Sequence, residues 1–221
     1  MKKNKLKIGF YVSGKSTRVI KILKLYSDIK DSTVLILSDS DENYALSKTC
    51  ETMKIQLEIV HYSKLGLKGK EKNKFLSNKL LKSFKEKKVD YGFSFGGKIL
   101  QGEILVDYKN KLINFHPSLL PHFPGINSID KALKGNVNLL GNTAHFIDEG
   151  IDTGPIIMQS VIHRSKFKDY NSVLDLQLPM IDQIFKWLIH ARISIVDDKV
   201  RILKSNSQVS FFPKIENSEF K

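Results

Sequence analysis

The fold is decided by a stretch that reads Leu112-Ile-Asn114-Phe-His116-Pro117. In a β-strand, residues i and i+2 point to the same face, so Asn114 and His116 project together while the apolar residues project to the other side. Pro117 has no backbone donor and should end the strand, which places His116 at its mouth. The stretch therefore predicts a buried strand that delivers an amide and an imidazole to one edge of a sheet.

A second stretch follows about thirty residues later and reads His145-Phe-Ile-Asp148-Glu149-Gly150-Ile-Asp152-Thr-Gly154-Pro155. It ends an apolar run in an acidic, glycine-rich turn. We interpret the two stretches as one active site, in which the acid is Asp148, Glu149 or Asp152. The alternative interpretation is a strand end and a plain acidic turn without chemistry.

The residue types in these stretches favour direct transfer with acid–base assistance. No serine lies in a Gly-x-Ser-x-Gly elbow, and the single cysteine, Cys50, lies in a predicted helix, so a covalent nucleophile is not indicated. A metal site built from His116, His145 and Asp152 lacks any supporting His or Cys spacing, and we expect no metal. The amide can stabilise an oxyanion, and the imidazole can donate to the same oxygen or carry a proton near neutral pH.

Strands alternate with helices along most of the chain. Strands are expected at 6–13, 33–38, 55–60, 89–95, 112–116, 143–147, 156–162 and 199–204, and helices at 19–25, 44–53, 71–87, 103–108, 128–134 and 169–191. This order predicts an α/β fold with a Rossmann-like, doubly wound, mostly parallel sheet. Asp169 should cap the last helix, and Pro179 should kink or divide it. We expect one domain over residues 1–204 and a tail over 205–221.

Three predicted strand ends should meet at the carboxyl edge of this sheet, where such folds bind ligands. They are Ser13-Gly14, Gly96-Gly97 and His116. The turn Gly14-Lys15-Ser16-Thr17-Arg18 could hold an anion at a helix N-terminus, and a plain turn is an equal alternative because the P-loop and dinucleotide spacings are absent.

Composition narrows the function classes. The chain has 221 residues, 41% of them hydrophobic and 27% charged, and a net charge of +13. No apolar run is long enough to span a membrane, no signal peptide is recognisable, and one cysteine suits a reducing compartment, so we expect a cytoplasmic protein. The lysines of residues 64–88 lie on the outer face of an amphipathic helix without interleaved aromatics, so no nucleic acid is expected. A homodimer through the C-terminal helices or through Phe211 and Phe212 is left open.

The two stretches together resemble the folate-dependent formyltransferases, most closely the phosphoribosylglycinamide formyltransferases. Methionyl-tRNA and nucleotide-sugar formyltransferases share the same core. The resemblance is specific over residues 93–161, looser over the first strand and turn, and fades beyond Asp169. It implies the formyltransferase fold and 10-formyltetrahydrofolate as the co-substrate.

The resemblance also implies residue roles. It places the catalytic residues at Asn114, His116 and Asp152, with His145 in support. It places the folate contacts at Lys98, Ile99, Leu100, Ile147, Asp148, Glu149 and Gly150. Contacts with the acceptor fall on Gly14, Lys15, Ser16, Thr17, Arg18, Pro117 and Ser118.

The acceptor side departs from the glycinamide ribonucleotide enzymes. Their Gly-Asn-Gly-Ser-Asn turn is replaced here by residues 14–18, and the Glu-His pair of their last long helix falls on Ile181 and Asp182. An anionic amine remains the expected acceptor, with glycinamide ribonucleotide as the default and a nucleotide-linked amino sugar as the alternative. Hydrolysis of formyl-folate and a non-catalytic binding protein are further alternatives. A tRNA acceptor is disfavoured because no C-terminal barrel domain is recognised.

Overall fold

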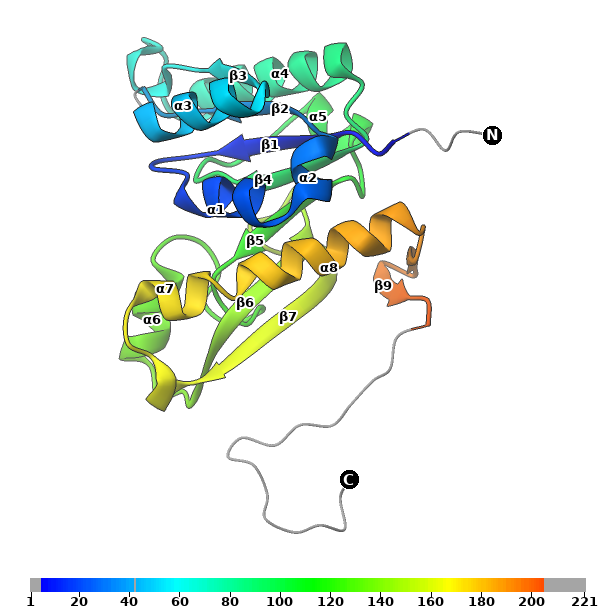
Figure 1. Ribbon diagram of the computed structural model, residues 1–221. Helices are drawn as coiled ribbons and strands as arrows, with labels where there is room; N and C mark the ends of the chain where they lie inside the picture. Colours follow the sequence, from blue (N-terminus) through cyan, green and yellow to red (C-terminus); the bar gives the residue numbers. More distant parts are fainter. Residues whose placement is uncertain (1–4, 42, 205–221) are drawn as a thin grey trace.

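The computed structural model describes residues 5–41 and 43–204, and its centre is a seven-stranded sheet (Figure 1). The strand order is β3-β2-β1-β4-β5-β6-β7. The strands are β1 (Ile8–Val12), β2 (Thr33–Ser38), β3 (Gln56–Ile59), β4 (Tyr91–Phe95), β5 (Leu112–His116), β6 (Leu139–Phe146) and β7 (Ile156–His163). Strands β1 to β5 pair in parallel, whereas β6 and β7 are antiparallel to their neighbours. The predicted doubly wound, mostly parallel sheet is confirmed.

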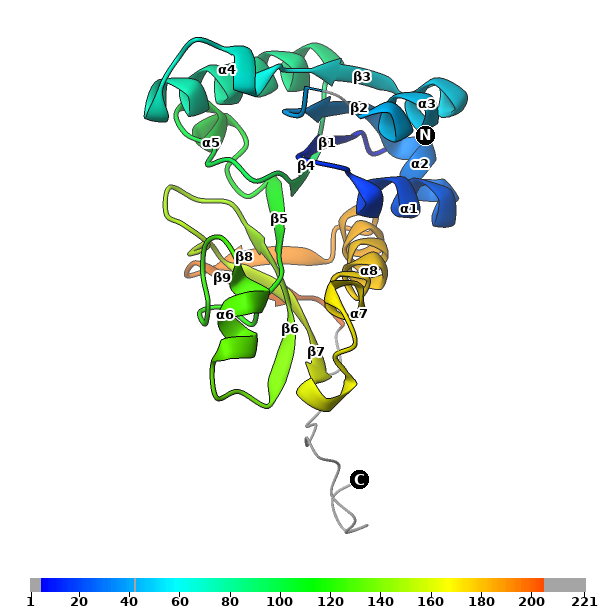
Figure 2. The ribbon, with the colours of Figure 1, turned by 90° about the vertical axis from the view of Figure 1, so that its left-hand side faces the viewer.

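Helices cover both faces of the sheet (Figure 2). One layer holds α1 (Thr17–Leu25), α2 (Ser27–Ser32), α3 (Tyr44–Met53), α7 (Tyr170–Leu174) and α8 (Gln177–Ile189), and the other holds α4 (Gly69–Lys87), α5 (Glu103–Asp107) and α6 (Ser128–Lys134). Neighbouring residues of one strand pack against opposite helix layers. Phe10 lies in the core between the sheet and helices α1 and α8, and Tyr11 lies in the core between the sheet and helix α4. The sheet is therefore buried on both faces, which explains the continuous apolar runs of its strands.

The topology places a crevice at the centre of the sheet's carboxyl edge. Strand β1 lies between β2 and β4, so the chain reverses its direction of winding between β1 and β4. At this point the Gly97 amide donates to the Ser13 hydroxyl at 2.7 Å, which joins the ends of the two strands. The expected meeting of the first and fourth strand ends is confirmed.

Strand β6 begins at Leu139, four residues before the predicted start at residue 143, and so includes Gly141 and Asn142. A Cβ atom on Gly141 would lie 2.0 Å from the Ser160 carbonyl oxygen, so glycine allows the close approach of β7. The buried Asn142 amide donates to the Val173 carbonyl at 2.8 Å and to the Ser160 hydroxyl at 3.0 Å. Tertiary partners thus satisfy a residue pair that would otherwise favour a turn.

The C-terminal region also differs from the sequence prediction. Asp169 caps as expected, but the helix divides at Asp175 and Leu176 into α7 and α8, because Pro179 has no N–H with which to bond the Asp175 carbonyl. A strand that the sequence prediction missed, β8 (Ile193–Val196), pairs with β9 (Lys199–Ile202). Their turn is Asp197-Asp198, both at positive φ, and it lacks the glycine that usually reveals such a hairpin.

None of the helices in residues 5–41 and 43–204 combines the length and apolar character needed to cross a lipid bilayer. The predicted tail over residues 205–221, with Phe211 and Phe212, lies outside the described residues.

Candidate active site

The mouth of β5 presents the two polar side chains that the sequence singles out. Asn114 and His116 point to one face, whereas Ile113 and Phe115 are buried in the core on the other. The antiparallel register of β5 with β6 sets His145 directly opposite Asn114. The Asn114 amide nitrogen lies 3.2 Å from His145 Nε2. An amide and two imidazoles therefore gather at one end of the β5–β6 pair.

Asp152 reaches this group from the turn between β6 and β7. One carboxylate oxygen lies 3.2 Å from His116 Nδ1, and the other lies 3.5 Å from His145 Nε2 and 3.4 Å from the Asn114 amide nitrogen. The Gly125 backbone N–H also donates to Asp152 at 2.7 Å. The Asp152 backbone adopts φ 56°, a left-handed conformation that aspartate tolerates better than most residues. Such local strain is commonly found where side-chain placement matters for function.

The other two acids of the turn have different surroundings. Asp148 accepts hydrogen bonds from the Gly150 N–H at 3.0 Å and from the Thr153 hydroxyl at 2.8 Å. Asp148 therefore stabilises the turn through hydrogen bonds within it. Glu149 is exposed to solvent. Of the three acids that the sequence leaves open, only Asp152 contacts His116.

The hydrogen bonds indicate how the two imidazoles are protonated. His145 Nδ1 lies 2.9 Å from the Phe146 carbonyl oxygen, which can only accept, so Nδ1 carries the proton and Nε2 is left to accept from Asn114. By the same argument, His116 Nε2 lies 3.0 Å from the Phe123 carbonyl and carries a proton. His116 Nδ1 then faces the Asp152 carboxylate and can donate to it only when the ring binds a second proton.

Opposing effects set the pKa values of this pair. Burial lowers the pKa of His116 below its ordinary value, although the Phe123 carbonyl and the charge of Asp152 act in the opposite direction. Burial alone would raise the pKa of Asp152. The interaction with the neighbouring His145, the hydrogen bond from the Gly125 N–H and the charge of His116 outweigh it, so the Asp152 pKa is lowered. Asp152 is therefore ionised and His116 is poised to gain or lose a proton below neutral pH.

These side chains open into a cleft of ≈ 700 Å³ at the carboxyl edge of the sheet. Its lining includes Arg18, Gly96, Gly97, Lys98, Ile99, Leu100, Asn114, His116, Pro117, His145, Ile147, Asp148, Gly150 and Asp152. Ile99, Ile126 and Ile151 line it from three separate loops and are 50%, 76% and 55% exposed. Exposed isoleucines around a concave site suit a flat apolar ligand.

The residues singled out as folate contacts lie together with one exception. Lys98, Ile99 and Leu100 enter the cleft after β4, and Ile147, Asp148 and Gly150 enter it after β6. Glu149 is not among the lining residues.

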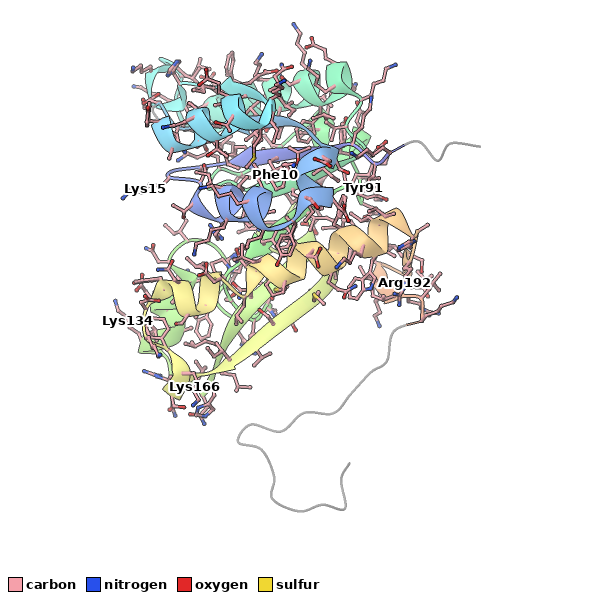
Figure 3. The ribbon with its side chains drawn as sticks, in the orientation of Figure 1. Phe10, Lys15, Tyr91, Lys134, Lys166 and Arg192 are labelled. Atoms are coloured by element: carbon pink, nitrogen blue, oxygen red, sulfur yellow. The ribbon has the colours of Figure 1, made fainter. Side chains whose placement is uncertain are left out.

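The residues singled out as acceptor contacts are more dispersed. Arg18 and Pro117 line the cleft, whereas residues 14–17 do not, and Lys15 projects away from the body of the protein (Figure 3). The Ser118 hydroxyl is buried and donates to the His122 carbonyl at 2.7 Å, so it stabilises its own loop.

Helix α8 contributes a residue that the sequence analysis missed. The two positions on which the Glu-His pair of the related enzymes falls lie outside the site, because Ile181 lies in the hydrophobic core and Asp182 pairs with Lys186 at 2.7 Å. Gln177, at the start of α8, instead accepts a hydrogen bond from Arg18 Nη1 at 2.5 Å. Gln177 was missed because the sequence analysis did not predict that a helix begins at this residue. The signal that could have revealed it is a polar residue on an otherwise apolar helix face.

The arrangement can perform proton transfer and stabilise a developing negative charge. Asn114 supplies amide donors through long, weak contacts, and His116 with Asp152 forms an acid–base pair. Within residues 5–41 and 43–204, no cluster of three or more His, Cys, Asp or Glu side chains is arranged to hold a metal ion.

The part of the chain that forms this cleft is similar to known proteins. A family model described as formyl transferase matches residues 6–175. A phosphoribosylglycinamide formyltransferase from Bacillus subtilis is 48% identical over 65 residues, which are 29% of this chain and 33% of the relative. A formyltetrahydrofolate deformylase from Haemophilus influenzae is 33% identical over 110 residues, 48% of this chain and 40% of the relative. The matched stretches thus span less than half of these two relatives.

The fold has solved counterparts. The structure of glycinamide ribonucleotide transformylase 1 from Symbiobacterium toebii superposes with a TM-score of 0.78 at 24% identity, covering 91% of this chain and 96% of that one. At this identity the similarity establishes the fold, and the predicted architecture is confirmed.

Proposed function

The chain belongs to the formyl transferase family, and from that premise we propose that it transfers a formyl group from 10-formyltetrahydrofolate to a primary amine on an anionic small molecule. The observation that carries the proposal is the convergence of Asn114, His116 and Asp152 in one cleft. These are the residue types that a direct transfer between two bound substrates requires.

In the proposed reaction, the acceptor amine attacks the formyl carbon. The carbonyl electrons move to oxygen, and the resulting oxyanion accepts hydrogen bonds from Asn114 and from the Nε2–H of protonated His116, which exchanges the Phe123 carbonyl for the oxyanion. Asp152 orients His116, supports its imidazolium form and assists the removal of the proton from the attacking nitrogen. Collapse of the tetrahedral intermediate breaks the bond to folate N10, which leaves with a proton as tetrahydrofolate.

The lining residues support a division of the cleft between the two substrates. The segments 98–100 and 147–150, together with the exposed Ile99, Ile126 and Ile151, offer apolar surface for the folate rings. Arg18, on α1, lines the same cleft and suits an anionic acceptor. We take glycinamide ribonucleotide as the default acceptor and a nucleotide-linked amino sugar as the next candidate.

A second candidate function is hydrolysis of formyltetrahydrofolate with water in place of the amine. It is favoured by the Haemophilus influenzae deformylase, whose match covers 48% of this chain, more than the phosphoribosylglycinamide formyltransferase match covers. The same Asn114, His116 and Asp152 would serve both reactions, because the oxyanion and the leaving group are identical.

A spectrophotometric assay of folate release separates these functions. The purified protein is given 10-formyltetrahydrofolate with glycinamide ribonucleotide, with nucleotide-linked 3- or 4-amino sugars, and without any amine. Amine-dependent release supports the transferase, and release of formate at the same rate without amine supports the hydrolase. No release under any of these conditions would contradict both.

A further inference from the structure

Arg18 occupies an unusual position beside the proposed reaction centre. Its guanidinium extends from the first turn of α1 and lines the same cleft as Asn114 and His116. The guanidinium carbon lies 5.1 Å from the centroid of the Phe95 ring, and Nη1 donates to Gln177 Oε1 at 2.5 Å. A ring face and a neutral amide thus hold the side chain in place.

Among the described residues, no carboxylate forms an ion pair with this guanidinium, although the charge of Asp175 acts on it from a distance. Within residues 5–41 and 43–204, Arg18 forms no ion pair, and the nearby Asp175 pairs with Lys21 at 2.8 Å instead. Burial lowers the pKa of Arg18, but a guanidinium remains protonated at any physiological pH. A partly buried positive charge without an ion-pair partner is unfavourable unless a ligand provides one.

The orientation of Gln177 is fixed by its other partners. Its side chain is fully buried, and Nε2 donates to the Phe115 carbonyl at 3.2 Å and to Asn142 Oδ1 at 2.8 Å. Asn142 in turn donates to the Val173 carbonyl and the Ser160 hydroxyl, so its oxygen must face Gln177. Gln177 can therefore present only its oxygen to Arg18, and it holds the guanidinium without cancelling its charge.

We propose that Gln177 is a specificity-determining residue: it positions Arg18 without forming an ion pair with it, so that Arg18 binds an oxyanion, a carboxylate or phosphate, of the acceptor molecule. Four of the five guanidinium N–H donors remain for this group, and the planar fork suits bidentate binding of either oxyanion. A glutamate at position 177 would form an ion pair with Arg18 and close the subsite. The assignment of the oxyanion to an acceptor rests on the proposed function, whereas the anion site itself does not.

The test measures anion binding directly, without turnover. Inorganic phosphate and succinate are titrated into the ¹⁵N-labelled protein, and the side-chain Nε–H signal of Arg18, assigned with the Arg18→Gln variant, is followed by NMR. At least one probe should shift this signal, and Gln177→Glu should weaken its binding about tenfold or more because the charge-assisted contact is lost. Phosphate alone would indicate a phosphorylated acceptor, and succinate alone a carboxylated one.

Lys24→Met is the matched control, because Lys24 lies on the same helix, is exposed and does not line the cleft. It should bind the probe as the unmodified protein does, and thermal unfolding of each variant verifies the fold. If Gln177→Glu is unstable, Arg18→Gln provides the same test by the loss of probe binding in calorimetry. The proposal is overturned if neither probe shifts the Arg18 signal, or if folded Gln177→Glu binds the probe as tightly as the unmodified protein.

The two proposals fail separately. A protein that transfers formyl groups but binds no anion at Arg18 would disprove the role of Gln177 and leave the proposed function intact. A protein that binds the probe through Arg18 but releases no tetrahydrofolate would retain the anion site and lose the proposed function.

Discussion

The Asp152 carboxylate and the His116 imidazole face each other at 3.2 Å, between Oδ2 and Nδ1. The same Asp152 oxygen accepts the Gly125 N–H at 2.7 Å, so one side chain joins the mouth of β5 to the loop that follows it. Because His116 also bonds the Phe123 carbonyl of that loop, its ring is held from both sides. These two contacts fix the orientation of the His116 ring in the cleft.

Replacing Asp152 with asparagine should lower kcat about 10²-fold or more, because His116 loses the charge that orients it and supports its protonated form. Steady-state folate release with the preferred acceptor measures the effect. Asp182→Asn, which alters a partly buried carboxylate paired with Lys186 on α8 and outside the cleft, is the control and should leave kcat unchanged. Equal kcat values for Asp152→Asn and Asp182→Asn would show that Asp152 has no role in the reaction.

The pKa of His116 should be below the ordinary value of 6.5 and should fall further in Asp152→Asn, because the nearby negative charge favours the imidazolium. NMR titration of the His116 ring protons measures both values. Since the unfolded chain binds this proton at higher pH than the folded one, the contribution of His116 makes the protein less stable as the pH drops from 6.5 toward the folded pKa. A folded pKa at or above 6.5 would contradict the dominant effect of burial.

Asn114→Asp should lower kcat by about 10²- to 10³-fold, because the isosteric carboxylate has no N–H to offer an oxyanion. It also adds a negative charge beside Asp152, at 3.4 Å from the present amide nitrogen. Comparison of kcat with the dissociation constant for folate distinguishes a chemical defect from a binding defect. Loss of folate binding with unchanged kcat would show that Asn114 positions the co-substrate instead.

The polar side chains at the carboxyl edge of the sheet could be predicted from sequence because their signals are local. The alternation around Asn114 and His116, the proline that follows, and the acidic turn each act over a few residues. The choice of Asp152 over Asp148 could not be made from spacing, since it depends on which carboxylate folds the turn and which points back to β5. The resemblance to known formyltransferases supplied that choice, and the hydrogen bonds now give its physical basis.

The acceptor side was harder to predict because its contacts join distant segments. Arg18 meets Gln177 across 159 positions of sequence, and no periodicity in α1 or α8 indicates such a pair. The Gly141-Asn142 pair has a local preference for a turn that contacts from β7, α7 and α8 override. Helix α8 likewise begins after a break, and the contact of its first residue, Gln177, with Arg18 could not be predicted from local sequence.

The exposed isoleucines of the cleft should contribute to folate binding. Replacing Ile99 and Ile151 together with serine should raise the KM for 10-formyltetrahydrofolate roughly fivefold or more, about 1 kcal/mol, because each side chain loses apolar surface that the folate rings would cover. Val106→Ser is the matched control, since Val106 is 71% exposed on α5 and does not line the cleft. An unchanged KM in the double variant would place the folate elsewhere.

Gly154→Ala tests whether the turn after Asp152 must hold its present path. A Cβ atom at this position would lie 1.9 Å from the Phe146 carbonyl oxygen, a backbone atom that cannot rotate away. The turn must therefore shift, and we expect a loss of about 1–3 kcal/mol in the free energy of unfolding together with a fall in kcat, because Asp152 moves relative to His116. Urea unfolding and the folate-release assay measure the two effects. A variant with normal kcat and reduced stability would mean that Asp152 keeps its contact with His116 when the turn moves, and that the proposed chemistry does not depend on the strained path of the turn.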